Sequence, residues 1–332
     1  MTGPLISRRH LGALAASAAL TPLSSALAQP AAFPQPGRPI RLLVGLAAGG
    51  ALDGQARALA RRLTESMGTQ VIVENKPGAS MMLSATELAR AQPDGYTLLY
   101  ATSSLIAQNP HTLASVPYDA FKDFTPITMA ARGPLVLTVH SSLQAQNARD
   151  LVAWAKANPG KLNFASFGTG TSSHIYAMAF AKSAGIEVTH VPYKGTAEAA
   201  RDLLEGRVQA YFDAAPTAIQ NSATGRVRMV GVASTRRMLA APDVPTFNEQ
   251  GITGVDLTSW ICIVGPARMP ADLVARLNTL LVQALSAPDV KEFFARGAWE
   301  TSPSTPAELA AEMRTAYDKW GAMVKQIGLE KQ

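Results

Sequence analysis

Residues 40–66 read IRLLVGLAAGGALDGQARALARRLTES and contain the pattern that decides the fold. The apolar run 40–44 predicts a buried strand, and the small residues of 45–50 predict a tight loop. Leucines then recur at helical spacing through 51–66, and Gly68 follows where such a helix would end. The stretch therefore predicts one strand–loop–helix unit.

The same alternation continues on both sides of a break in the chain. Strands are expected at 71–73 and 96–101 with a helix at 83–91 between them, which predicts parallel βαβ units and an α/β fold. Residues 124–140 are mostly extended, and a second series follows them. In that series we expect strands at 162–167, 188–193, 210–213, 229–233 and 259–264, and helices at 148–157, 174–184, 197–204 and 271–327. The last helical stretch should be broken at Pro288 and near residues 302–306.

Two such series predict two similar α/β lobes joined by crossing strands. We expect the chain to cross near Ala131 and to return near Ser259. Residues 29–131 plus 259–332 would then form lobe 1, and residues 132–258 would form lobe 2. A chain of about 300 residues also exceeds what one hydrophobic core usually serves, which favours two domains.

The first residues have the features of an export signal. A serine and the pair Arg8-Arg9 precede an apolar run at 11–20, and Ala26-Leu27-Ala28 follows. This order is typical of a secretory signal peptide, and the arginine pair suggests twin-arginine export. The alternative, a membrane anchor, is disfavoured because the run is shorter than the ~20 apolar residues that span a bilayer. We therefore expect residues 1–28 to be cleaved and the mature chain to be periplasmic.

Composition excludes several classes of protein. The net charge is +6, and removing residues 1–28, which hold two arginines and no acid, lowers it to +4. No Lys/Arg stripe is present, so a nucleic-acid partner is not expected. The one cysteine, Cys262, lies in an apolar run and is expected to be a buried, inert thiol.

Two loops are candidates for binding an anion. Residues 45–53 and 167–174 are both rich in small residues between a predicted strand and a predicted helix, where backbone N–H groups and the helix dipole favour negative charge. Because ligands of open α/β sheets bind at the carboxyl ends of strands, the two loops would form a carboxylate clamp. The structural alternative is a tight turn with Asp53 in the first helical turn, and Ser172 or Ser173 as a helix N-cap.

Catalysis is not expected. Neither a G-x-S-x-G elbow nor a metal-binding His/Cys pattern occurs, so we expect no cofactor or metal. The alternative is an exported hydrolase using Ser172 or Ser173 with His174, which would need an orienting acid. A third hypothesis is a receptor retained for signalling to a sensor kinase.

The chain resembles the Bug-type receptors, which are the substrate-binding components of tripartite tricarboxylate transporters. The resemblance extends from about residue 37 to beyond residue 300. The matching stretches are 38–42, 48–53, 73–79, 93–99, 116–119, 122–126, 167–174, 191–195, 242–246 and 259–260.

The resemblance implies a type II periplasmic-binding-protein fold, two α/β lobes joined by crossing strands with the ligand cleft between them. It implies that loops 47–53 and 168–174 grip a ligand carboxylate and that residues near Asp213 close the other side. The implied partners are a small organic acid and integral-membrane transporter subunits, and we expect a monomer. The expected ligand-binding residues are Ala47, Gly49, Gly50, Asp53, Ser80, Met81, Ser103, Gly168, Thr169, Thr171, Ser172, His174 and Asp213.

One segment departs from the family pattern. Ser80-Met81-Met82 stands where the family usually has glycines and a polar residue, and Leu46-Ala47 stands where it often has Phe and Pro. Methionine adds adaptable apolar surface that contacts rings well. We therefore expect a ligand with one carboxylate and a less polar body lying against Met81 or Met82. The alternative is that both methionines point into the core of the lobe.

Overall fold

The computed structural model describes residues 33–193, 195–255 and 258–331. Residues Pro36–Gln332 form one compact unit, which is distinct from the unit Met1–Gln35. The predicted signal peptide, residues 1–28, lies outside the described residues.

The first sheet contains the strand of the opening pattern at its interior. Strand β1 pairs in parallel with β2 on one side and β3 on the other, while β10 pairs antiparallel with β3 and β4. Its six strands, in spatial order, are β11 (Glu300–Thr301), β4 (Phe124–Gly133), β10 (Ser259–Pro266), β3 (Thr97–Thr102), β1 (Ile40–Val44) and β2 (Val71–Asn75).

The second sheet repeats this plan with five strands. Strand β6 pairs in parallel with β7 and β8, and β5 pairs antiparallel with β8 and β9. The order is β7 (Thr189–Pro192), β6 (Asn163–Ser166), β8 (Ala210–Ala214), β5 (Leu135–His140) and β9 (Val227–Ala233). Two α/β lobes, each with its own mixed sheet, confirm the predicted fold class.

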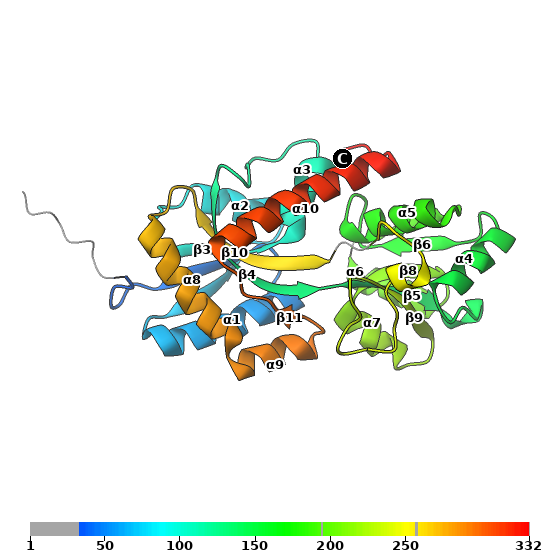
Figure 1. Ribbon diagram of the computed structural model, residues 1–332, viewed down its shortest axis with the longest axis horizontal. Helices are drawn as coiled ribbons and strands as arrows, with labels where there is room; N and C mark the ends of the chain where they lie inside the picture. The colour runs from blue at the N-terminus through cyan, green and yellow to red at the C-terminus, as the bar shows by residue number, and fades with distance from the viewer. Residues whose placement is uncertain (1–32, 194, 256–257, 332) are drawn as a thin grey trace, which may run out of the picture. The chain divides into compact units, whose positions relative to one another are not determined.

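Helices cover both faces of each sheet (Figure 1). In the first lobe α1, α8 and α9 lie on one face and α2 and α10 on the other; in the second, α5 lies opposite α6 and α7. The α-helices are α1 (Ala51–Met67), α2 (Met82–Ala89), α3 (Asn109–Thr112), α4 (Ala148–Ala157), α5 (Ser172–Ala184), α6 (Thr196–Leu204), α7 (Ala215–Ser222), α8 (Ala271–Ser286), α9 (Pro288–Arg296) and α10 (Pro306–Ile327). Short helical turns are η1 (Ala79–Met81), η2 (Ser104–Gln108, π-helical), η3 (Ser141–Leu143) and η4 (Asn248–Gln250).

The ends of the long helices follow from local sequence. Gly68 ends α1 in the left-handed region at φ 62°, a conformation that glycine adopts at little cost. Helix α10 begins with a reciprocal capping box, in which Thr305 accepts from the Glu308 N–H and the Glu308 carboxylate accepts from the Thr305 N–H.

Two connections carry the chain between the sheets. Strand β4 ends at Gly133 in the first sheet and β5 begins at Leu135 in the second; the return runs from the end of β9 to the start of β10. At the first crossing the Trp299 ring lies so close to the Gly133 backbone that an added Cβ would stand 2.5 Å from a ring carbon. Only glycine fits there without moving the ring.

The core of the second lobe is aromatic, and the C-terminal helix joins it. Phe212 packs against Phe164, Phe180 and Phe247 with ring centroids 5.7–6.2 Å apart, and each such buried side chain contributes about 1.5–3 kcal/mol. We expected the C-terminal helices to pack back on the first lobe. Helix α10 does so through η2 and β4, but it also contacts α5 in the second lobe.

Candidate functional site

The first predicted loop lies at the carboxyl end of β1. Ala47, Gly49 and Gly50 are exposed, and the helix that follows has no side-chain cap at its N-cap residue, Gly50. The first N–H groups of α1 therefore have no intrahelical acceptor, as at any helix N-terminus. This exposed backbone can donate to an anion.

Asp53 holds the loop in place. Its buried carboxylate accepts from the Gly49 N–H at 2.9 Å and from Arg57 Nε at 2.9 Å. The Arg57 hydrogen bond lowers the pKa of Asp53, so the group is ionised at neutral pH. Asp53 lies in the first turn of α1, as the structural alternative required, and supports the loop from within.

The second predicted loop lies at the carboxyl end of β6. Gly168 and Gly170 have φ of 140° and 74°, which glycine adopts readily, and Thr171 Oγ1 donates to the Gly168 carbonyl at 2.6 Å. Helix α5 starts at Ser172, two residues earlier than expected. Its N-cap residue is Thr171, without a side-chain cap, so the alternative of Ser172 or Ser173 as N-cap is wrong. Thr169 is exposed at the tip of this loop.

The His174 side chain forms a hydrogen bond within the second loop, and its imidazole is neutral. Its Nδ1 accepts from the Gly170 N–H at 3.1 Å, which places the ring proton on Nε2. Its ring stacks on His190 with centroids 3.7 Å apart. Burial, followed by the neighbouring His190, lowers the pKa of His174 to about 4. Among the described residues no hydrogen bond joins His174 to Ser172 or Ser173, so these residues do not form the nucleophile–base pair that the hydrolase alternative requires.

Ser80, Met81 and Ser103 gather at the carboxyl ends of β1 and β3. Ser80 and Met81 have φ of 52° and 70°, a region that costs a non-glycine residue about 1–2 kcal/mol. The Met81 side chain lies directly over Gly45, whose added Cβ would stand 2.6 Å from the Met81 Cβ, and Thr102 Oγ1 donates to Met81 Sδ at 3.4 Å. Ser103 is buried and accepts from the Trp260 N–H at 3.3 Å.

A segment that sequence reasoning missed connects the two lobes here. Gln108, in η2, donates from Nε2 to the Gly170 carbonyl at 2.7 Å, and Asn109 donates from Nδ2 to the Ser80 carbonyl at 2.9 Å. Both side chains are buried, and Gln108 Oε1 has no hydrogen-bond partner among the described residues. The signal for them was a Gln–Asn pair directly after the apolar residues 105–107.

Asp213 lies one residue before the end of β8, next to the strand that leads to the second loop. Its Oδ1 accepts from the Ala214 N–H at 2.7 Å, and the side chain is almost fully buried. Burial raises the pKa of Asp213 to about 7, so the carboxyl is partly protonated near neutral pH. A protonated carboxyl can donate a hydrogen bond to a ligand carboxylate.

The predicted residues therefore form two groups. Loop 47–53, Ser80, Met81 and Ser103 lie at the ends of β1 and β3, and loop 168–174 and Asp213 lie at the ends of β6 and β8. Among the described residues, no hydrogen bond joins loop 47–53 directly to loop 168–174; the Gln108 bond reaches the second loop from η2.

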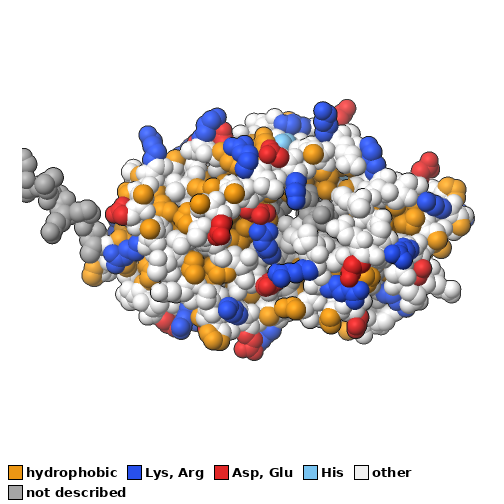
Figure 2. All heavy atoms as spheres, in the orientation of Figure 1, with side chains coloured by type: hydrophobic (Ala, Val, Ile, Leu, Met, Phe, Trp, Pro, Cys, Tyr) orange, Lys and Arg blue, Asp and Glu red, His pale blue; other side chains and the backbone are white. Residues whose placement is uncertain are grey.

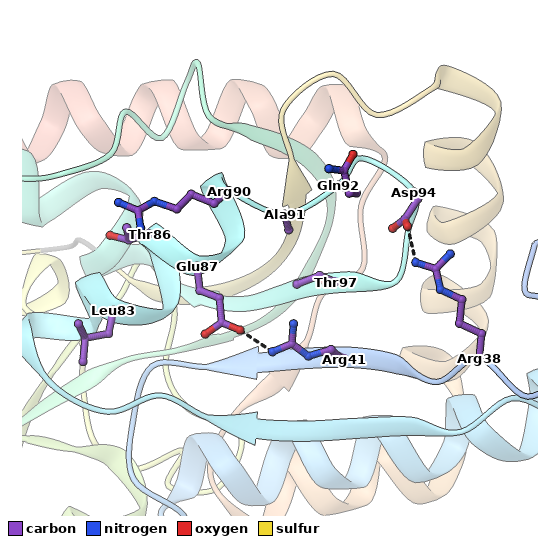
Figure 3. A pocket seen from close by; sticks show the side chains of 10 residues that line it. All are labelled: Arg38, Arg41, Leu83, Thr86, Glu87, Arg90, Ala91, Gln92, Asp94 and Thr97. Carbon is purple, nitrogen blue, oxygen red and sulfur yellow. Dashed lines mark hydrogen bonds and ion pairs between the residues drawn. The ribbon is translucent and has the colours of Figure 1, made fainter.

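A separate surface cavity of about 710 Å³ contains none of these residues. Figure 3 shows two of its three arginines engaged: Arg38 points at Asp94, and Arg41 points at Glu87. Arg41 also makes a two-bond ion pair with Glu74 at 2.7 Å. Arg38 and Arg41 thus already have carboxylate partners, which leaves Arg90 as the one lining arginine without such a partner among the described residues.

No helix in the described part of the chain has the length and apolar character needed to cross a membrane.

Comparisons with known proteins agree with this architecture. The sequence model described as the tripartite tricarboxylate transporter family receptor matches residues 55–329. A "UPF0065 protein in tcbD-tcbE intergenic region" from Pseudomonas sp. (strain P51) is 35% identical over 89% of this chain and 88% of its own length. Protein BugT of Bordetella pertussis is 31% identical over 88% and 90%.

Solved structures give the same result. R. palustris Rpa4515 with adipate superposes with a TM-score of 0.80 at 30% identity, covering 90% of this chain and 99% of its own. MatC of Rhodopseudomonas palustris with bound malate gives a TM-score of 0.75 at 27% identity, covering 87% and 100%. The two lobes, the paired strand-to-helix loops and these matches together show that the chain belongs to the tripartite tricarboxylate transporter receptor family, the Bug-type solute receptors.

Proposed function

We propose that the chain is a non-catalytic periplasmic receptor that captures a small organic acid and delivers it to the membrane subunits of a tripartite tricarboxylate-type transporter. The observation that carries the proposal is the pair of glycine-rich strand-to-helix loops, each followed by a helix without a side-chain N-cap. Both helix N-termini favour a carboxylate. The two related structures bind adipate and malate, which are small organic acids of the kind proposed here.

We assign ligand binding to the two groups of residues described above. In this proposal the exposed backbone of loop 47–50 and the start of α5 donate to the ligand carboxylate, and Asp53 and His174 hold those loops in shape. Ser80, Met81 and Ser103 line the first lobe's side, and Asp213 closes the second lobe's side. We place the lobe boundaries at 131/132 and 258/259 and expect the receptor to act as a monomer.

A thermal-shift screen against carboxylic acids tests the function. A ligand that binds only the folded state stabilises it by mass action and so raises the melting temperature. At a ligand concentration of 100 Kd the free energy of unfolding increases by about 2.7 kcal/mol. We expect stabilisation by at least one small organic acid and no product on prolonged incubation with it or with ester substrates. Turnover of an ester that is lost in Ser173→Ala would favour the hydrolase hypothesis instead.

Export is a proposal of its own, because residues 1–28 lie outside the described residues. We expect mature protein isolated from the periplasm to begin at or very near Gln29, directly after Ala26-Leu27-Ala28. Intact-mass measurement and N-terminal sequencing check this. Changing Arg8 and Arg9 to lysine tests the route, because loss of export would indicate the twin-arginine pathway. Most exported protein retaining Met1 would contradict cleavage.

Ligand preference is expected to depend on the Met81 segment. Met81 is half-buried at the ends of β1 and β3, and its sulfur cannot donate a hydrogen bond to a second carboxylate. We therefore expect calorimetry to rank benzoates and nicotinate above citrate and glutamate. A Met81→Gly/Met82→Asn variant should change that ranking, and its glycine relieves left-handed strain of about 1–2 kcal/mol.

Met313→Leu is the matched control, because Met313 is buried in α10 and belongs to neither group of site residues. It should leave the ranking unchanged. A wild type that prefers citrate or glutamate, or a double variant with the parent's ranking, would show that the methionines only fill the core of the lobe.

A further inference from the structure

A second, larger cavity lies where the chain crosses between the lobes. Its volume is about 1040 Å³. Its walls come from the segment after β9 in the second lobe and from α9, β11 and α10 in the first, and Arg132 and Trp260 of the two crossing strands line it as well. Figure 2 shows several Lys and Arg side chains near the middle of this face of the molecule.

The order of the strands separates this cavity from the candidate carboxylate clamp. In the first sheet, β1 and β3 carry the clamp residues on one side of β10, whereas β4 and β11 line the cavity on its other side. In the second sheet, β6 and β8 lie on one side of β5, whereas β9, which leads into the cavity wall, lies on the other. None of the predicted clamp residues lines the cavity.

Positive charge exceeds negative charge around the cavity. Five basic and two acidic side chains line it, a formal charge of +3, although one of the five, Arg237, pairs at 3.0 Å with Glu249, which lies outside the lining. Arg132 pairs with Glu312 at 3.0 Å and Arg236 pairs with Glu300 at 2.9 Å, and these pairs use both acids. Lys291 and Lys319 have no carboxylate within 4.0 Å among the described residues, so their ammonium groups can take an anion.

The cavity also offers apolar surface beside these cations. Trp299 is half-buried against Gly133, and the almost fully buried Trp260 and Trp320 also line the cavity. Leu239, at 89% exposed, stands at the cavity on the segment after β9. Aromatic rings next to ammonium groups suit a ligand with an apolar, preferably aromatic, body and an acidic group.

We propose that this hinge-side cavity is a second binding site, for an amphipathic aromatic anion held by Lys291 and Lys319 against the tryptophan side chains. The Arg236–Glu300 ion pair already joins the two walls, one from each lobe. A ligand that contacts both walls favours one separation of the lobes, and by thermodynamic linkage its occupancy alters the affinity of the clamp.

The probe for the test is 1-anilinonaphthalene-8-sulfonate, an aromatic anion whose fluorescence rises on leaving water. We expect saturable binding of one molecule per chain, with energy transfer from tryptophan. In Lys291→Glu/Lys319→Glu the dissociation constant should rise by about tenfold or more, a change of about 1.4 kcal/mol or more, because both ammonium contacts to the sulfonate are lost.

Two variants serve as controls. Lys156→Glu/Lys161→Glu makes the same change of charge at exposed positions on and beyond α4, and Gly50→Val alters the clamp loop. Both should bind the probe like the wild type. The proposal is overturned if the probe shows no saturable binding, if the Lys291/Lys319 variant binds it unchanged, or if either control loses it to the same degree. Circular dichroism and melting curves establish that each variant is folded.

Discussion

Replacing Gly50 by valine is expected to abolish binding of the ligand found by thermal-shift screening, with at least a hundredfold loss of affinity, while the fold is kept. Gly50 has φ −81° and ψ 173°, which valine adopts without strain, and an added Cβ would meet only the Ala47 carbonyl, at 3.7 Å. The branched side chain would instead cover the exposed backbone N–H groups at the start of α1. A hundredfold loss corresponds to about 2.7 kcal/mol, comparable to one or two hydrogen bonds to a charged group.

Two variants make this result specific. Gly195→Val changes another helix-initiating glycine with extended φ and open space around it, outside the assigned site, and should bind normally. Ser172→Ala should weaken binding by roughly 0.5–1.5 kcal/mol if its hydroxyl makes a neutral hydrogen bond to the ligand, and by more if the bond is to charge. Calorimetry gives all three affinities. Full affinity in both Gly50→Val and Ser172→Ala would place the ligand elsewhere.

The order of elements was predictable because it depends on local signals. Apolar runs of strand length, glycine-rich loops and helical spacing recur along the chain, and each is set by residues a few positions apart. The strand Ile40–Val44 and the helix from Ala51 follow directly from them. The breaks after α8 and before α10 were also predicted, from Pro288 and from the segment 302–306.

The hydrogen bond that joins the two lobes, from Gln108 to the Gly170 carbonyl, could not be predicted from local signals. Gln108 and Asn109 are polar residues in a π-helical and helical segment, and their burial depends on the Gly170 and Ser80 carbonyls, which are distant in sequence. A polar side chain at such a position suggests a solvated loop unless its acceptor is known. The roles of Asp53 and His174 were ambiguous for the same reason: their partners, Gly49 and Gly170, became evident only from the loop geometry.

The second large effect is a dependence of stability on pH that Asp213 controls. Its folded-state pKa of about 7 lies above its usual value of 3.8, so the folded state keeps the proton that the unfolded state loses between pH 4 and 7. The contribution of Asp213 to the free energy of unfolding is therefore fully present below pH 4 and is lost as pH rises. The loss reaches about 4 kcal/mol by pH 8. Asp213→Asn keeps an oxygen to accept from the Ala214 N–H and cannot ionise. We expect its stability relative to wild type to increase from pH 4.5 to pH 8 in denaturant titrations.

Asp53→Asn supplies a comparison of opposite sign within the same candidate site. The hydrogen bond from Arg57 lowers the pKa of Asp53, so its contribution to stability is present above the unfolded-state pKa and is lost as pH falls through the folded-state pKa. The Asp53→Asn variant should therefore be destabilised at neutral pH and approach wild type in acid. If Asp213 binds the ligand as we propose, its neutral form donates to the ligand carboxylate and its ionised form repels it, so ligand affinity of the wild type should also fall from pH 6 to pH 8. In Asp213→Asn that fall in ligand affinity should disappear. If the difference in the free energy of unfolding between Asp213→Asn and wild type stays constant with pH, the buried carboxyl is ionised throughout and the prediction is wrong.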